Sequence, residues 1–293
     1  MKAYLFPGQG SQYKGMGREL FQQNADSKSV FEQANEILGF SLTDVMFNGS
    51  EEDLKQTKIT QPAIFTHSIA ALKGIDNFEP DMVAGHSLGE FTALVAAGAL
   101  TFKAGLELVY QRAMAMQEAC EMQSSTMAAV LGLEDHIVEE ICENIEGIVV
   151  AANYNCPGQL VISGEVEAIN KACDTLKNRG ARRALVLPVG GAFHSPLMES
   201  ARVKLEEAIQ NTDFEPPVCA VYQNVDGLST TDVSIIKEKL IRQLTSPVKW
   251  THTIEKIIED GADTIIEVGP GKVLVGLAKK IDTQKKVTTF YNV

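Results

Sequence analysis

The residues with the clearest chemical potential form the pentapeptide Gly85-His86-Ser87-Leu88-Gly89. It lies where an apolar run that predicts a strand, 81–84, meets a run that predicts a helix, 90–97. A serine hydroxyl is a weak nucleophile near neutral pH, so it must be held outward on a tight turn, near a base and near donors for an oxyanion. The pattern predicts a nucleophile elbow in which Ser87 attacks and the Leu88 N–H binds the oxyanion. A serine that only caps a helix gives the same bare motif, but the strand-turn-helix context favours the nucleophile.

A serine nucleophile needs a base, and the sequence has five histidines. His194 lies in a loop after the apolar run 184–188 and before a helix expected near Pro196, and loops placed by a rigid scaffold often carry catalytic side chains. We expect His194 to be the base, although a histidine in an ordinary turn would have the same surroundings. His86 is held within the elbow, and the other three lie in predicted helical segments at positions 67, 136 and 252.

Composition limits the classes of function. The chain of 293 residues has a formal net charge of -12 and a pI near 5.0, whereas a nucleic-acid surface needs clustered basic residues. The five cysteines form no Cys-x-x-Cys pair, so we expect reduced thiols and no metal site. No apolar run approaches the roughly 18 to 20 residues of a spanning helix, and the first residues lead into a motif instead of a cleavable signal. We therefore expect a cytoplasmic protein without membrane or nucleic-acid contact.

The order of predicted elements indicates an α/β protein. Strands and helices alternate up to about residue 121, which is typical of a parallel sheet covered by helices. The expected elements are a strand over 2–6, helical structure over 15–39, a helix opened by Gln61-Pro62 and ending at 72, a strand over 80–84, and helices over 90–97 and 102–121.

The order changes between about residues 126 and 188. Strand, helix, strand, strand, helix and strand follow one another, a βαββαβ order typical of ferredoxin-like domains. We expect a large α/β-hydrolase-like domain with a parallel sheet, formed by residues 1–124 and 190–293, and an inserted ferredoxin-like small domain over 125–189. The chain would return to the large domain for a strand over 264–267, and the active site would lie in the cleft between the domains.

Five short segments occur in an order that resembles malonyl-CoA:acyl carrier protein transacylases, and this resemblance covers essentially all of the chain. It implies transfer of malonyl from the coenzyme A thiol to the phosphopantetheine thiol of acyl carrier protein, which supplies extender units to fatty acid synthesis. We expect no cofactor other than malonyl-CoA as substrate, and a monomer. The segments are Phe6-Pro7-Gly8-Gln9-Gly10-Ser11-Gln12, Gly85-His86-Ser87-Leu88-Gly89-Glu90, Asn153-Tyr154-Asn155-Cys156-Pro157-Gly158-Gln159, Ala192-Phe193-His194-Ser195 and Val268-Gly269-Pro270-Gly271-Lys272-Val273-Leu274.

The resemblance also implies partners for the Ser87–His194 dyad. Ordinary α/β hydrolases have an acidic residue between the serine and the histidine, and here none stands out in that role. By resemblance, the backbone carbonyl of Gln243 orients His194 instead, and the backbone N–H of Gln9 is a second oxyanion donor beside Leu88. The glycines that flank Gln9 also suit a simple turn after the first strand.

Further side chains are expected to recognise the substrate. By resemblance, Arg112 binds the free malonyl carboxylate, for which a planar guanidinium fork is well suited, whereas the helical position alone would predict a solvated arginine. Phe193 would narrow the pocket against a C2-methyl group and favour malonyl over methylmalonyl. His86 is expected to bind substrate, and Asn153 and Asn155 to line the coenzyme A side, although asparagines near Pro157-Gly158 also form turns.

Three other functions fit parts of the sequence. A discrete malonyl acyltransferase of a polyketide synthase pathway would use identical chemistry and differ only in its carrier protein. A serine thioesterase or lipase-like hydrolase would not need Arg112 and would need an acid that is not evident. A non-catalytic module that binds a carrier protein would require a broken dyad, whereas both Ser87 and His194 are present.

Docking of an acidic carrier on an acidic chain requires a locally basic surface. Basic residues cluster around Gly180, where a solvated helix end is the ordinary explanation and a docking surface the functional one. An alternative location is near Lys279 and Lys280. The cluster consists of Lys177, Arg179, Arg182 and Arg183.

Overall fold

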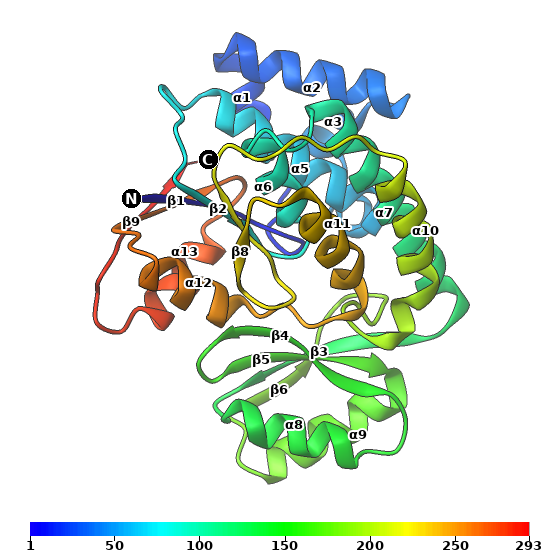
Figure 1. Ribbon diagram of the computed structural model, residues 1–293. Helices are drawn as coiled ribbons and strands as arrows, with labels where there is room; N and C mark the ends of the chain where they lie inside the picture. Colours follow the sequence, from blue (N-terminus) through cyan, green and yellow to red (C-terminus); the bar gives the residue numbers. More distant parts are fainter. Residues whose placement is uncertain (293) are drawn as a thin grey trace.

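The computed structural model describes residues 1–292 and forms two β-sheets with helices around them (Figure 1). In the larger, six-stranded sheet, neighbouring strands pair in parallel except for β8, which is antiparallel to β7. The predicted parallel sheet is therefore confirmed. Its strands, in spatial order, are β10 (Thr288–Asn292), β9 (Thr264–Val268), β1 (Lys2–Phe6), β2 (Met82–Gly85), β7 (Ala220–Tyr222) and β8 (Ser229–Thr230).

Both faces of this sheet are buried, which is why its central strands are almost entirely apolar. In β1, Tyr4 and Phe6 join one hydrophobic core while Ala3 and Leu5 join the other, as the alternation of side chains along a strand requires. The first core includes residues of α5 (Thr57–Lys73), α6 (Gly89–Ala96) and α7 (Phe102–Met122), and the second includes residues of α12 (Trp250–Glu259) and α13 (Val273–Ile281).

The other helices around the six-stranded sheet extend the helical layer that contributes to the first core. In Figure 1, α1 to α3 lie at the outer end of the molecule, beyond α5. They and the later helices are α1 (Arg18–Gln23), α2 (Ala25–Leu38), α3 (Leu42–Asn48), α4 (Glu51–Lys55), α10 (Glu199–Gln210) and α11 (Val233–Arg242), with short 3-10 turns η1 (Pro196–Met198) and η2 (Gln243–Thr245). Among residues 1–292, no helix has the length and apolar character needed to cross a membrane.

The start of α5 differs from the prediction. The helix begins at Thr57, four residues before Gln61, and Pro62 lies inside it. Proline lacks an N–H and removes one helical hydrogen bond. The earlier turn nevertheless forms because the N–H groups of Ile59 and Thr60 both donate to the Gln56 carbonyl, and because most of α5 is buried. Tertiary packing therefore outweighs the local effect of the proline.

The second sheet has four antiparallel strands, which follow the predicted order of strands and helices over 126–188. Its interior face packs Ala128 and Val130 against α8 (Asp135–Asn144) and α9 (Val166–Asn178). Figure 1 shows this sheet and its two helices below the rest of the molecule. Its strands, in spatial order, are β4 (Val149–Cys156), β5 (Gln159–Glu165), β3 (Ser125–Leu131) and β6 (Arg183–Val186).

One edge of the four-stranded sheet is hydrogen-bonded to the segment between η2 and α12. The Tyr154 N–H donates to the Val248 carbonyl at 2.9 Å, and the Val248 N–H donates to the Ala152 carbonyl at 2.8 Å. β4 also changes register on either side of Asn153, which pairs with Val248 as an isolated parallel bridge. These contacts fix β4 relative to the chain that follows Gln243.

Candidate active site

The elbow between β2 and α6 requires glycine on both sides of Ser87. A Cβ at Gly85 would lie 1.8 Å from the carbonyl carbon of Gly89, and one at Gly89 would lie 2.0 Å from the Phe6 carbonyl oxygen. Ser87 itself has φ 52°, in the left-handed region that non-glycine residues rarely adopt. The strand and helix therefore cross too closely for side chains at either glycine, and the strained backbone turns Ser87 outward.

Ser87 and His194 lie within hydrogen-bond distance. Ser87 Oγ is 2.7 Å from His194 Nε2, and His194 Nδ1 is 2.9 Å from the Gln243 carbonyl oxygen. A carbonyl oxygen only accepts, so the proton sits on Nδ1 and Nε2 presents its lone pair to the serine hydroxyl. His194 comes from the loop between β6 and η1 and also has a left-handed backbone, with φ 58°.

Burial lowers the pKa of His194 to about 3, and the positive charge of Arg112 adds to the decrease. The hydrogen bond to the Gln243 carbonyl acts in the opposite direction. His194 is therefore neutral near pH 7, which is the state required of a base that accepts the serine proton.

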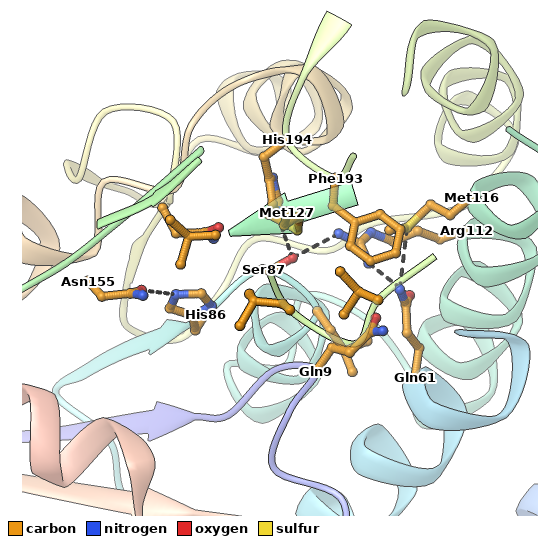
Figure 2. Close-up of a pocket in the computed structure, with 15 residues that line it drawn as sticks. Gln9, Gln61, His86, Ser87, Arg112, Met116, Met127, Asn155, Phe193 and His194 are labelled. Atoms are coloured by element: carbon orange, nitrogen blue, oxygen red, sulfur yellow. Dashed lines mark hydrogen bonds between the residues drawn. The ribbon is translucent and has the colours of Figure 1, made fainter. Parts of the chain in front are cut away.

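Arg112 is fully buried on α7 and points at the same serine (Figure 2). Its Nη2 donates to Ser87 Oγ at 3.1 Å and to Gln243 Oε1 at 3.0 Å, and its Nη1 donates to Gln61 Oε1 at 2.8 Å. Burial lowers the pKa of Arg112 to about 10, an effect that the charge of Glu90 opposes, so the guanidinium stays protonated near pH 7. Since its hydrogen-bonding partners are neutral, the cation can receive an anionic group from the pocket.

These groups open into a pocket of about 170 Å³. Figure 2 shows Ser87 between His194 and Arg112, with Gln9 on one side and His86 on another. Gln243 is buried behind the pocket and is not among its lining residues. The other sequence-predicted site residues all line it: Gln9, His86, Ser87, Leu88, Arg112, Asn153, Asn155, Phe193 and His194.

Gln9 and Leu88 line this pocket from two segments of the chain, the loop after β1 and the start of α6. The loop after β1 passes so close to the elbow that a Cβ at Gly8 would lie 2.3 Å from the His86 carbonyl oxygen. Within residues 1–292, neither the Gln9 nor the Leu88 N–H donates to another group of the chain. Two free donors beside a nucleophile are what an oxyanion hole requires.

His86 and Asn155 connect the pocket to a neighbouring one. His86 Nε2 lies 2.9 Å from Asn155 Oδ1, and the His86 ring lies 5.3 Å from the Trp250 ring. Burial lowers the pKa of His86, so its neutral ring donates to the amide oxygen and fixes the asparagine. A second pocket of about 150 Å³ shares Gln9, His86 and Asn155 and extends to Leu277 of α13.

Sequence reasoning missed several polar residues around the dyad. Gln61 accepts a hydrogen bond from Arg112, and Asn224 Oδ1 accepts the Ser87 N–H at 2.7 Å. Glu90 was visible in the elbow motif but had no assigned role. Gln61 stands before a proline in a helix and Asn224 in a short loop, so neither has a local pattern that indicates chemistry.

Comparison with known proteins agrees with the site. The chain matches the acyl transferase domain model over residues 3–289, and it belongs to that family. It is 45% identical to the malonyl CoA-acyl carrier protein transacylase of Bacillus subtilis (strain 168), across 97% of this chain and 91% of the relative. The resemblance inferred from the five segments is therefore confirmed.

Solved structures give the same result. The malonyl CoA-acyl carrier protein transacylase from Coxiella burnetii superimposes with a TM-score of 0.94 at 39% identity, covering 98% of this chain and 93% of that one. A type II PKS acyl-carrier protein in complex with its malonyl-transacylase contains a chain with a TM-score of 0.93 at 39% identity, covering 99% and 94%. The mixed α/β fold with its parallel sheet is thus that of solved malonyl transacylases.

Proposed function

We propose that the protein is an acyltransferase that moves malonyl from malonyl-CoA to the phosphopantetheine thiol of acyl carrier protein, for fatty acid biosynthesis. The observation that carries this proposal is the buried Arg112 guanidinium, 3.1 Å from the Ser87 hydroxyl that also contacts His194. A cation at this distance suits an acyl group that ends in a carboxylate. The named activity of the relatives supports the same reaction.

In the first half-reaction, Ser87 Oγ attacks the thioester carbonyl carbon while His194 Nε2 takes the hydroxyl proton. The N–H groups of Gln9 and Leu88 hold the oxyanion of the tetrahedral intermediate. The C–S bond then breaks, His194 returns the proton to the coenzyme A sulfur, and malonyl remains as an ester on Ser87. The neutral Gln243 carbonyl orients the imidazolium, which suffices because a thiolate is a weakly basic leaving group.

The second half-reaction uses the same groups in reverse. The carrier thiol gives its proton to His194 and attacks the ester carbon. The C–O bond to Ser87 breaks, and the serine oxygen takes the proton back from His194. The product is malonyl thioester on the carrier, and the enzyme returns to its starting state.

Specificity is proposed to arise on two sides of the pocket. Arg112, held by Gln61 and Gln243, releases Ser87 Oγ and pairs with the malonyl carboxylate. Phe193 is buried in the pocket wall and would contact a C2-methyl group, which disfavours methylmalonyl. His86, Asn153 and Asn155 lie towards the second pocket, where the coenzyme A arm would run.

The same proposal includes a domain arrangement. Residues 1–124 and 190–293 would form an α/β-hydrolase-like domain, and residues 125–189 an inserted ferredoxin-like domain. The strand order β4-β5-β3-β6 with two helices on one face supports this arrangement. We also propose a cytoplasmic enzyme. We propose that it is a monomer without a cofactor, because one chain supplies every group that the transfer uses.

Intact-protein mass spectrometry tests the reaction. After mixing with malonyl-CoA, the wild type should gain one malonyl group and Ser87→Ala none, and holo acyl carrier protein should then discharge the adduct while gaining the same mass. Release of free malonate without transfer to the carrier would instead establish a hydrolase. A label on a cysteine of Ser87→Ala would refute the proposed nucleophile.

A polyketide carrier is the second candidate partner, because one structural neighbour is a malonyl-transacylase in complex with a type II PKS acyl-carrier protein. Discharge rates with a fatty acid carrier and with a polyketide carrier, measured on the same acylated enzyme, distinguish the two. Faster discharge by the polyketide carrier would reassign the partner and leave the chemistry unchanged.

A further inference from the structure

A buried carboxylate lies directly behind the dyad and takes no part in the chemistry proposed above. Glu90, in the first turn of α6, is fully buried. Its Oε1 accepts from Gln223 Nε2 at 2.9 Å, and its Oε2 accepts from the Asn224 N–H at 3.0 Å and from Gln243 Nε2 at 2.9 Å. Three N–H donors around one carboxylate satisfy an anion and leave no need for a proton on it.

One branch of this network holds the elbow backbone. Asn224, fixed by Glu90 through its N–H, accepts the Ser87 N–H at 2.7 Å and donates from Nδ2 to the Gly85 carbonyl at 2.7 Å. Both contacts fall on the strained turn. Asn224 thus holds the backbone of the turn at Gly85 and at Ser87.

The other branch runs through Gln243 to Ser87, Arg112 and His194. Gln243 Nε2 donates to Glu90 and also to the Ser87 carbonyl at 3.0 Å, which directs Gln243 Oε1 towards Arg112 Nη2. The backbone carbonyl of the same Gln243 accepts from His194 Nδ1. If this side-chain amide were turned over, its NH2 group would face the guanidinium, and two donors would oppose each other.

Burial and the surrounding groups act on the charge of Glu90 in opposite directions. Burial raises the pKa of Glu90, while the hydrogen bonds from Asn224, Gln243 and Gln223 and the charge of Arg112 act against that rise. Arg112 in turn is a buried cation whose direct hydrogen bonds go to neutral groups. The three N–H donors favour the carboxylate form of Glu90, and in that form it is a counter-charge for Arg112, separated from it by one amide.

We infer that Glu90 is a positioning residue for the acylation step: through Asn224 and Gln243 it holds the Ser87 turn, the orientation of His194 and the direction of Arg112. Glu90 touches no substrate and exchanges no proton in the reaction. The inference rests on the proposed malonyl transfer and extends it to a residue without an assigned role. It predicts a change in the rate constant of chemistry, common to charged and uncharged acyl groups.

The test is rapid-quench measurement of single-turnover Ser87 acylation, with malonyl-CoA and with acetyl-CoA, for the wild type and Glu90→Gln. A glutamine keeps the shape but presents an NH2 group to one of the three donors. The limiting rate constant should fall about tenfold or more with both thioesters, the loss expected for charge-assisted hydrogen bonds. The half-saturating malonyl-CoA concentration should not rise, because Arg112 remains and has lost its counter-charge. Glu90→Asp, which keeps the charge, should recover part of the rate.

Glu267 provides a matched control. It is a buried carboxylate at the end of β9 that accepts from the Leu274 and Val275 N–H groups, away from the dyad. Glu267→Gln should lower the melting temperature without changing the limiting rate constant. If Glu90→Gln likewise lowers only the acylated fraction or the melting temperature, Glu90 is merely structural and the inference is wrong.

Two further variants keep the test decisive if Glu90→Gln does not fold. Asn224→Ala and Gln243→Ala each remove one branch, and each should lower the limiting rate constant. Unchanged rate constants in both would overturn the inference. Absence of any acyl-enzyme in the wild type is a different result, since it would refute the proposed function itself.

Discussion

The two sides of the catalytic pocket differ in chemistry. The side built on the six-stranded sheet, with Gln9, Ser87, Leu88 and Arg112, supplies the serine hydroxyl proposed as nucleophile, two free N–H donors and a buried cation. The side built on the four-stranded sheet supplies apolar side chains and amides: Met127, Asn153, Asn155 and Val161. Under the proposed function, we expect charge recognition and bond making to depend on the side built on the six-stranded sheet, and the other side to shape the path of the substrate.

The largest effect is expected from Arg112 on the charged side. Arg112→Ala should lower kcat/KM for malonyl-CoA about 10- to 150-fold, because a bidentate charge-assisted contact of about 1.5–3 kcal/mol is lost. Acetyl-CoA, which has no carboxylate, should react as well as before or better. Arg112→Lys should recover only part of the malonyl activity, since an ammonium keeps the charge but lacks the fork.

The measurement for Arg112 is kcat/KM with both thioesters for the wild type and the two variants. An equal loss for malonyl and acetyl would mean that Arg112 supports the fold or the dyad. The difference in charge recognition between the two sides of the pocket would then disappear.

A smaller effect is expected on the opposite side. Asn155→Ala removes a hydrogen-bonding amide that His86 holds in place. The half-saturating malonyl-CoA concentration should rise about 2- to 12-fold, the range for one hydrogen bond of about 0.5–1.5 kcal/mol. The limiting acylation rate should stay constant, so a large fall in that rate would place Asn155 in the chemistry.

The basic cluster between the end of α9 and the start of β6 should have a still smaller effect. Arg179 and Lys177 form exposed ion pairs with Glu140 and Asp174, each at 3.5 Å, whereas Arg182 and Arg183 are exposed. Reversing the last two charges should raise the apparent KM for carrier protein about 2- to 10-fold and flatten its salt dependence.

Self-acylation by malonyl-CoA serves as the control for charge reversal, because it does not involve the carrier protein. It should be unchanged. Carrier kinetics that also stay unchanged would place docking elsewhere, for example near Lys279 and Lys280.

The smallest expected effect concerns pH. Because burial and Arg112 lower the pKa of His194 to about 3, the base form persists well below the ordinary histidine value. The limiting acylation rate with acetyl-CoA should therefore be level between about pH 5 and about pH 7, where an ordinary histidine would titrate.

Malonyl-CoA should behave differently as the pH is lowered. A bound malonyl carboxylate offsets the Arg112 charge and raises the pKa of His194, so activity with malonyl-CoA should decline at a higher pH than activity with acetyl-CoA. The check is a pair of rapid-quench pH profiles, and identical profiles would contradict the coupling.

The elbow could be predicted because its information is local. A strand, two glycines and a helix within a dozen residues describe one turn, and the clash distances at Gly85 and Gly89 show why no other residue fits. The roles expected for Arg112 and Gln243 came from a family resemblance. Position on a helix alone would have left Arg112 in solvent, whereas the structure buries it.

Other parts had no local signal. The strands β7 and β8 have three and two residues, too few to show an alternating pattern, and they were not predicted. The contact between Glu90 and the Asn224 N–H joins residues 134 positions apart, and only tertiary structure brings them together. The early start of α5 likewise depends on packing that surrounds the helix.

The left-handed backbones of Ser87 and His194 have a consequence for thermostability. Each non-glycine residue in this region costs of order 1–3 kcal/mol, and glycine would relieve most of that cost. A chain selected only for heat resistance would thus place glycine at both positions and lose its reaction. The molecule is less stable than its own fold allows at the two residues proposed to carry out acyl transfer, and screens for stabilising substitutions should return inactive variants there.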